Sequence, residues 1–394
     1  MNGPIISFDV SKGTSHAQGF LSYSEPTSRA FSFVHDLDGY DKISKLAASI
    51  KEKTGNNPSC ILESTGVYSM PLVAFLLSSG FIVYIISPLE SAKMRKAEIR
   101  PTKNDSKDCA TIAKVYYTRA LKSLSIAGDV YSDLREMSRQ YQYELNVAVQ
   151  EKNRYHRCLD AVWPLFDEVI LYDSEAALAI VSKFGHPSKI KTKKSVLSVI
   201  NKISTGKISR ETLADHVVEY AKKHNSGCDV SSYCVEETVE MANRVKKEIG
   251  RLRKTLNKMN EKAKDLPEYK LLKSLPNVGE RSAVRLLAEI GDINKFNSKK
   301  SFIAYIGLDP MVLQSGKNTG EHLSITKKGN KFLRTTLYLC ITNIMRLSPD
   351  SKIAQFVLKK KSDGLCLKAA KVAGSAKLAR IIYSMMTNGV CYKA

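Results

Sequence analysis

Four carboxylates in the first third of the chain have the residue types and spacing that metal-assisted phosphoryl transfer requires. Asp9 lies in the apolar run IISFDVSK, Glu63 closes the run CILES, and Asp105 and Asp108 lie in TKNDSKDCATIA. A separation of three places the last two on one face of a helix. Four carboxylates held together repel one another, and Mg²⁺ or Mn²⁺ would remove that repulsion. Two such ions about 4 Å apart could activate an attacking oxygen and stabilise a leaving one.

Each carboxylate, taken alone, also has a simpler explanation. Asp105 is a good helix N-cap residue, Asp9 could lie on the surface of a strand, and Glu63 could keep a strand end solvated. A D-x-x-D spacing is common in helices. The functional interpretation therefore depends on the four residues converging on one site.

The elements predicted for residues 1–125 would bring these carboxylates together. Short runs rich in β-branched and aromatic residues predict strands, and a helix with one apolar face is predicted over 37–54, ending at Gly55. The predicted order β-β-β-α-β-α-β-α is that of the ribonuclease-H-like (RuvC-like) α/β fold. A parallel pairing of the first and fourth strands would place Glu63 close to Asp9.

Residues 126–266 are predicted to form long helices, from about 129 to 165 and from about 232 to 264. Apolar residues in the second helix recur at intervals of three and four, as in a coiled-coil seam. A hairpin of the two helices and a dimer interface explain this seam equally well. Residues 166–230 are predicted as short helices with a basic edge that could cap such a hairpin.

Residues 267–394 form a predicted basic, mainly helical C-terminal domain. They hold 22 Lys and Arg against 8 Asp and Glu, a surplus of 14 out of the net charge of +22 of the whole chain. Such a surplus is typical of nucleic-acid binders. The segment LLKSLPNVGERSAVRLLAEIG predicts a helix-hairpin-helix-like element, with Gly279 at a positive φ and Arg281 at the start of a helix that could bind a phosphate. A purely structural helical turn is the alternative.

Ser315 lies in a second basic segment, within the sequence QSGKNTGEHLSITKKGNKFLR. Gly316 next to it allows a sharply turned, exposed hydroxyl, and nearby cations could hold a phosphate. These cations are Lys317, Lys327, Lys328, Lys331 and Arg334. On chemistry alone, Ser315 is one serine among many, and a turn serine is the simpler interpretation. His322 is predicted to be a loop residue rather than a base.

These segments resemble a known family of bacterial transposases. The motifs FDVSK, ESTGVY and TKNDSKDCATIA are similar to the DEDD domain of the insertion-sequence family numbered one hundred and ten, which is related to the Piv-type pilin-gene invertases. The QSGK motif and the TKKGNKFLR stretch resemble the family's serine-bearing C-terminal domain. The resemblance covers roughly two thirds of the chain, and residues 166–230 look like an insertion.

The resemblance implies a mechanism and a set of partners. Ser315 would attack a DNA phosphate and form a phosphoserine linkage. A serine hydroxyl is weak at neutral pH and would need activation, for which metal held by the carboxylates is favoured. The partners implied are DNA at the element ends and target, a bridge RNA that guides recognition, and a second copy of the chain in a homodimer or homotetramer.

A transposase is therefore the first functional hypothesis, and two others stay open. One is a RuvC-like endonuclease of the Holliday-junction type, in which Ser315 is incidental. The other is a non-catalytic nucleic-acid scaffold. No window approaches 18 uncharged apolar residues and no signal-peptide pattern is present, so a cytoplasmic bacterial protein without a membrane span is predicted. The eight scattered cysteines form no C-x-x-C pair and predict no zinc site.

Overall fold

The computed structural model describes residues 3–393, with gaps. The gaps are residues 65, 97–104, 122, 125–129, 204, 207, 312–313, 316–317 and 320–323; the side chains of 89, 96, 105–107, 314–315 and 318–319 also lie outside the description. The chain divides into two compact units, Met1–Ala127 and Gly128–Ala394. Each unit is described by itself.

The N-terminal unit is built on a mixed six-stranded sheet with the order β3-β2-β1-β5-β6, in which β4 also pairs with β2. Strand β1 is antiparallel to β2 and parallel to β5, which is in turn parallel to β6. The strands are β1 (Ile5–Asp9), β2 (Thr14–Ser22), β3 (Glu25–Pro26), β4 (Phe31–Val34), β5 (Ser59–Glu63) and β6 (Val83–Ile86). The parallel pairing predicted for the first strand and the strand that ends at Glu63 is confirmed.

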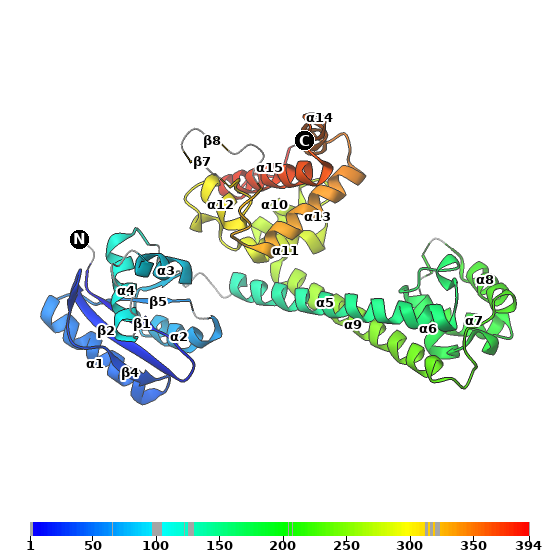
Figure 1. The fold of residues 1–394 in the computed structure, drawn as a ribbon, viewed down its shortest axis with the longest axis horizontal. Helices are drawn as coiled ribbons and strands as arrows, with labels where there is room; N and C mark the ends of the chain where they lie inside the picture. Colours follow the sequence, from blue (N-terminus) through cyan, green and yellow to red (C-terminus); the bar gives the residue numbers. More distant parts are fainter. Residues whose placement is uncertain are drawn as a thin grey trace. The chain divides into compact units, whose positions relative to one another are not determined.

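Alternate residues of β1 and β5 face different helices. Ile6 and Phe8 share a core with α1 (Leu37–Thr54) and α2 (Met70–Ser78), whereas Ile5 and Ile61 share a core with α4 (Asp105–Thr118). Because strand side chains alternate with period two, Asp9 and Glu63 belong to the α4 face. Helix α3 (Pro88–Lys96) packs against α4 (Figure 1).

Local signals fix helix α1 where the sequence predicts it. Asp36 Oδ1 accepts a hydrogen bond from the Gly39 N–H at 2.8 Å and caps the first turn. At the other end Gly55 has a φ of 69°, and its N–H donates to the Lys51 carbonyl. A side chain at Gly39 would collide with the Val34 carbonyl, since its Cβ would lie 1.9 Å from that oxygen.

Two long helices, α5 (Val130–Val162) and α9 (Tyr233–Ala263), lie side by side in the second unit (Figure 1). They are antiparallel, because Asp133 pairs with Lys262 near one end and Arg154 with Glu237 near the other. The predicted seam of α9 faces inward. Met241, Val245 and Met259 are buried, and Val239, Ile249, Leu252 and Leu256 are half-buried. The seam thus lies inside a hairpin of this chain.

The segment between these helices forms a small helical cap with its own core. It consists of α6 (Glu175–Phe184), α7 (Lys193–Ile200) and α8 (Arg210–Lys223), with 3-10 turns at Phe166–Glu168 and Pro187–Lys189. Trp163 is fully buried in this core, and its Nε1 donates to the Gly185 carbonyl at 2.9 Å. Tyr220 stacks on Trp163 and donates its hydroxyl to the Pro164 carbonyl at 2.8 Å. The cap therefore closes the end of the hairpin.

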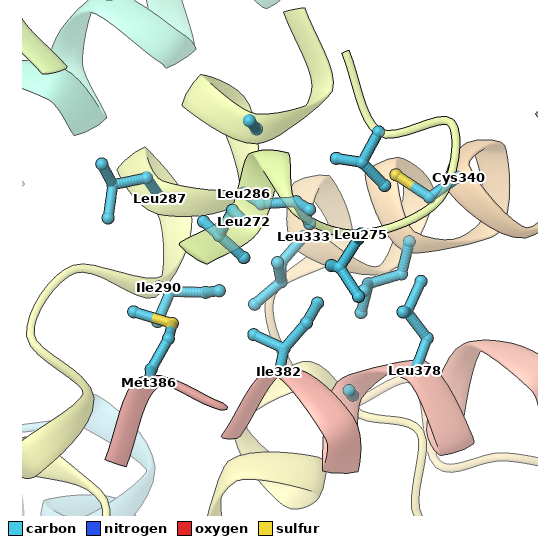
Figure 2. Close-up of a cluster of buried hydrophobic side chains, with 14 of the residues drawn as sticks. Leu272, Leu275, Leu286, Leu287, Ile290, Leu333, Cys340, Leu378, Ile382 and Met386 are labelled. Carbon is cyan, nitrogen blue, oxygen red and sulfur yellow. The ribbon is translucent and has the colours of Figure 1, made fainter. Parts of the chain in front are cut away.

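The rest of the second unit is a helical bundle around a leucine- and isoleucine-rich core (Figure 2). Its helices are α10 (Pro267–Lys273), α11 (Glu280–Ile290), α12 (Lys299–Ile306), α13 (Lys331–Leu347), α14 (Lys352–Ser362) and α15 (Leu367–Asn388), with a 3-10 turn at Ile293–Lys295. Leu378, Ile382 and Met385 of α15 are buried, and Ile381 is half-buried.

The α/β character of the N-terminal unit and the helical character of the remainder are confirmed. In the described part of the chain, no helix is long and apolar enough to cross a lipid bilayer.

Candidate active site

Asp9 and Glu63 occupy equivalent positions on two adjacent parallel strands. Each directly follows a residue of the last registered pair, Phe8 opposite Leu62. Neighbouring strands lie about 4.8 Å apart. Both carboxylates are half-buried at the ends of their strands, on the face that α4 covers. The strand pairing thus brings two of the four predicted site residues together.

Asp108 reaches the same region from the first turn of α4 and is buried. The next residue, Cys109, is buried and interacts electrostatically with both Asp108 and Asp9. The pKa of the Cys109 thiol is raised to about 12, chiefly by burial. The negative charges of Asp9 and Asp108 add to this rise, and a hydrogen bond with the Asp9 backbone partly offsets it. The fourth predicted carboxylate, Asp105, is the first residue of α4, but its side chain lies outside the described residues.

Helix α3 contributes two contacts to these carboxylates that the sequence did not predict. The Ser91 hydroxyl donates a hydrogen bond to Glu63 Oε2, and Ser91 is fully buried. Arg95 Nε lies 3.4 Å from Asp108 Oδ1. The sequence signal for them is weak, since a Ser and an Arg four residues apart are common on helices.

The donor set fits a divalent cation in its chemistry. Carboxylate oxygens are the ligands that Mg²⁺ and Mn²⁺ prefer. Asp108 Oδ1 is buried and, in the described part of the chain, accepts no hydrogen bond, so it has free capacity for a ligand. The described side chains do not gather three His, Cys, Asp or Glu at one point close enough to hold an ion.

The helix-hairpin-helix-like element forms as predicted from α10, a turn and α11, but the positive φ predicted for Gly279 is wrong. Gly279 has a φ of −75° and is the N-cap of α11, whereas the left-handed residue of the turn is Asn277, with a φ of 53°. Asparagine tolerates this conformation better than most residues. A Cβ on Gly279 would meet no atom within 4 Å, so the backbone here is open. Arg281 is exposed, with its guanidinium 5.6 Å from the centre of the Tyr141 ring.

Ser315 lies at the tip of a short antiparallel hairpin. Strand β7 (Gln314–Ser315) pairs with β8 (Asn318–Thr319), with Ser315 opposite Asn318, so that only Gly316 and Lys317 separate the two strands. Gly316, Lys317 and His322 lie outside the described residues. At the base of the hairpin, the Met311 N–H donates to the Ser324 carbonyl and the Thr326 N–H to the Asp309 carbonyl, both at 2.9 Å.

The predicted cations after the hairpin divide into two groups. Lys327, Lys328 and Lys331 are exposed. Arg334 is half-buried, and its Nη1 donates to the Ile306 carbonyl at 2.6 Å, where burial lowers its pKa. The exposed lysines are therefore free to meet a polyanion, whereas Arg334 also anchors the end of α12.

A buried carboxylate network fixes the end of the basic loop, the segment 324–330 that carries Lys327 and Lys328. Glu289 of α11 is 1% exposed and accepts two hydrogen bonds from Arg139 of α5, at 3.0 and 2.9 Å. It also accepts one from Asn330 Nδ2 at 2.7 Å. Asn330 Oδ1 in turn accepts from the N–H groups of Phe332 and Leu333 and so caps α13. Glu289 thereby links three helices directly behind the exposed lysines, a role that a single Glu in an apolar helix did not indicate.

Comparisons with known proteins agree with the motifs on which this site depends. A family model described as transposase, of the IS110 DEDD type, matches residues 6–164. A second, described as transposase of the IS116/IS110/IS902 family, matches residues 269–356. The two matches cover both the carboxylates and the hairpin that carries Ser315.

Curated relatives agree with these matches. An uncharacterised 43.6 kDa protein of insertion element IS110 from Streptomyces coelicolor is 23% identical over all of this chain and 96% of its own length. The transposase of IS1111A from Coxiella burnetii is 31% identical over 33% of this chain and 36% of its own. The pilin gene-inverting protein of Moraxella bovis is 31% identical over 29% of this chain and 36% of its own.

These family matches and relatives define a DNA-modifying enzyme of the transposase class. Within that class, the chain belongs to the IS110 family, and the predicted resemblance is confirmed. Membership of a DEDD transposase family also suggests the use of a divalent metal.

Proposed function

We propose that the chain cleaves and exchanges DNA strands for an insertion element. It would use Mg²⁺ or Mn²⁺ held by Asp9, Glu63, Asp105 and Asp108, with Ser315 as the nucleophile. The observation that carries this proposal is the adjacency of Asp9 and Glu63 on parallel strands, with Asp108 on the helix that covers the same face. The names of the IS1111A transposase and the pilin gene-inverting protein support strand exchange as the reaction.

The sheet order supports a ribonuclease-H-like fold for the N-terminal unit. Three antiparallel strands, β4, β2 and β1, are followed by the parallel strands β5 and β6. We propose a DEDD catalytic domain over 1–125, a helical middle over 126–266 with its insertion at about 166–230, and a basic serine-bearing domain over 267–394.

The chain's own residues would divide the chemistry between them. A bound divalent ion would favour ionisation of the attacking oxygen and offset charge on the phosphate. Ser315 Oγ would lose its proton to water and form a bond to phosphorus, while the bond from phosphorus to a deoxyribose oxygen breaks. That oxygen would take up a proton and leave as a hydroxyl, and the serine would become a phosphoserine. The exposed Lys327, Lys328 and Lys331 would hold neighbouring phosphates, with Lys317 and Arg334 adding positive charge.

The helix-hairpin-helix-like element would contact nucleic-acid phosphates other than those held by the lysines after the Ser315 hairpin. The open backbone at Gly279, the N-terminus of α11 and the exposed Arg281 support that role. A hollow of about 460 Å³ beside them is lined in part by Lys264, Lys270 and Lys273.

We also propose the partners that this family's reaction would need. They are the DNA of the element ends and of the target, and a bridge RNA that pairs with both. At least two copies of the chain would hold two duplexes, as a homodimer or a homotetramer. The net charge of +22 supports binding of such polyanions.

One observation favours a second candidate, a RuvC-like endonuclease. The carboxylates lie in the unit Met1–Ala127, whereas Ser315 lies in the other unit, so a hydrolytic site could operate without the serine. The scaffold hypothesis would require that neither the carboxylates nor the serine affect any reaction.

Three variants incubated with element-end DNA and Mg²⁺ separate these functions. Ser315→Ala should abolish both strand cleavage and the covalent protein–DNA adduct, which denaturing gels and peptide mass spectrometry detect. Ser324→Ala, an exposed serine nine residues further along the same segment, is the matched control and should behave as the wild type. Asp9→Asn should lose cleavage but keep DNA binding.

The outcomes that contradict the proposal are distinct. Full cleavage by Ser315→Ala would favour the endonuclease. An adduct at any other residue would refute the serine mechanism, and full activity in both Ser315→Ala and Asp9→Asn would leave only the scaffold.

A further inference from the structure

Helix α3 presents two side chains to the candidate carboxylate site from one of its faces. Ser91 and Arg95 are four residues apart, which places them one above the other. Ser91 donates to Glu63, and Arg95 faces Asp108. One helix therefore contacts two of the proposed ligands, and it supplies a hydroxyl to one and a positive charge to the other.

The Arg95–Asp108 contact is loose for a pair so well buried. The two side chains are 28% and 9% exposed, yet Arg95 Nε lies 3.4 Å from Asp108 Oδ1. In the part of the chain that the structure describes, neither atom has a hydrogen-bond partner. A buried ion pair recovers its desolvation cost only when its geometry is good.

A second Arg–carboxylate pair in the same chain is, by contrast, fully hydrogen-bonded. Arg139 makes two hydrogen bonds to the buried Glu289, at 3.0 and 2.9 Å. The Arg95–Asp108 contact lacks such hydrogen bonds, so Asp108 Oδ1 accepts none from the described residues although a positive charge lies near it. Arg95 Nε is thus placed to balance the charge of Asp108 from 3.4 Å without donating a hydrogen bond to this oxygen.

We propose that Arg95 is an exchangeable counter-ion of the carboxylate site, which balances Asp108 when no divalent cation is bound and releases it when one binds. Once released, its guanidinium turns to a phosphate of the DNA backbone. This inference rests on the metal site of the proposed function. It assigns Arg95 two successive anionic partners, a carboxylate and a phosphate diester.

Mn²⁺ binding to the full chain, measured by isothermal titration calorimetry without DNA, tests the first step. Arg95→Met should bind Mn²⁺ about three- to tenfold more tightly than the wild type, because the competing cation is gone. Arg95→Lys keeps the charge and should stay close to the wild type. Arg119→Met is the matched control. Arg119 pairs at 3.8 Å with Glu90 of α3, which is not one of the proposed metal ligands, so the change should leave Mn²⁺ affinity unchanged.

Duplex DNA of arbitrary sequence tests the second step through the salt dependence of its binding. In Mn²⁺, Arg95→Met should reduce the slope of log K against log salt by about 0.9, the loss of one phosphate contact. In EDTA the slopes of the variant and the wild type should coincide, because Arg95 is then held by Asp108.

Failure of this inference and failure of the proposed function give different results. If the wild type binds Mn²⁺ and Asp9→Asn does not, but Arg95→Met has unchanged or weaker affinity, only the role of Arg95 is refuted. A slope change that is the same with and without Mn²⁺ also refutes it, since Arg95 would then be a permanent phosphate contact. No Mn²⁺ binding by the wild type refutes both.

Discussion

Gly329 shows how one absent side chain sets the path of the basic loop. A Cβ at this position would lie 2.4 Å from the Tyr305 carbonyl oxygen and 2.7 Å from the Gly307 nitrogen, both of them backbone atoms that cannot rotate away. The loop therefore runs against the end of α12 at van der Waals distance. Lys327 and Lys328 are exposed directly before this contact.

Gly329→Ala should destabilise the chain by about 1–3 kcal/mol, the usual cost of forcing extra volume into a filled site. Gly250→Ala is the control, because Gly250 is exposed within α9 and its Cβ would meet nothing within 4 Å. That change should stabilise by about 0.5–1 kcal/mol, since glycine costs a helix conformational entropy. Urea-unfolding midpoints measure both, and shifts of the same sign would contradict the argument.

The residues that sequence could predict are those whose position follows from a strand or helix pattern. The sequence predicts that Asp9 and Glu63 lie side by side, because each closes a short apolar run and the two strands are expected to be parallel. The structure has this parallel pairing. The role of Arg95 could not be predicted, because its pairing with Asp108 depends on how α3 packs against α4. The left-handed turn residue was assigned to Gly279 because glycine adopts it most readily, but Asn277 takes it.

At the scale of elements, Glu289 holds α11, α5 and α13 together through one carboxylate. Its partners differ in exposure: Glu289 is 1% exposed and the side chain of Arg139 is 46% exposed. Removal of the arginine leaves a buried charge without its counter-charge. Removal of the carboxylate charge leaves an arginine that water can reach.

Arg139→Met should therefore cost more stability than Glu289→Gln. We expect a loss of about 2–4 kcal/mol for the arginine variant, less than for a fully buried pair because Arg139 is partly solvated. Glu289→Gln keeps an oxygen for Asn330 and should cost about 1–2 kcal/mol. Circular dichroism during urea unfolding gives both values, and a larger loss for Glu289→Gln would refute this explanation.

Long elements with a regular apolar spacing were predictable from sequence, and the cap was not. The seam of α9 and the apolar face of α1 identified both helices closely. Residues 166–230 gave only short helical signals, because their core is assembled from side chains far apart in sequence, such as Trp163 and Tyr220. Helix α3 gave no apolar period, and its place depends on contacts with α4.

At the scale of the whole molecule, the net charge of +22 dominates any encounter with nucleic acid. A charge surplus of this size makes binding steeply dependent on salt, because each neutralised phosphate releases counter-ions. The exposed lysines beside the Ser315 hairpin should contribute more to this dependence than lysines elsewhere.

Lys327→Gln combined with Lys328→Gln should reduce the slope of log K against log salt by about 1.8, or 0.9 for each phosphate contact. Lys51→Gln combined with Lys53→Gln removes the same charge from the exposed last turn of α1 and should leave the slope unchanged. Fluorescence anisotropy of labelled duplex DNA across a salt series measures both. Equal slope changes in the two double variants would refute direct phosphate contacts by Lys327 and Lys328. The lysines would then act only through the net charge of the chain.

The antiparallel α5–α9 pair also has a length that matters to DNA. Arg139, beside the C-terminal bundle, and Val162, where α5 meets the cap, are 23 residues apart, or about 35 Å along the helix. One turn of B-form DNA is about 34–36 Å. For any duplex that runs alongside the pair and touches both ends, the two contacts fall one period apart on the same side of the double helix. The separation of 23 residues between these two positions of α5 thus corresponds to one helical turn of B-form DNA.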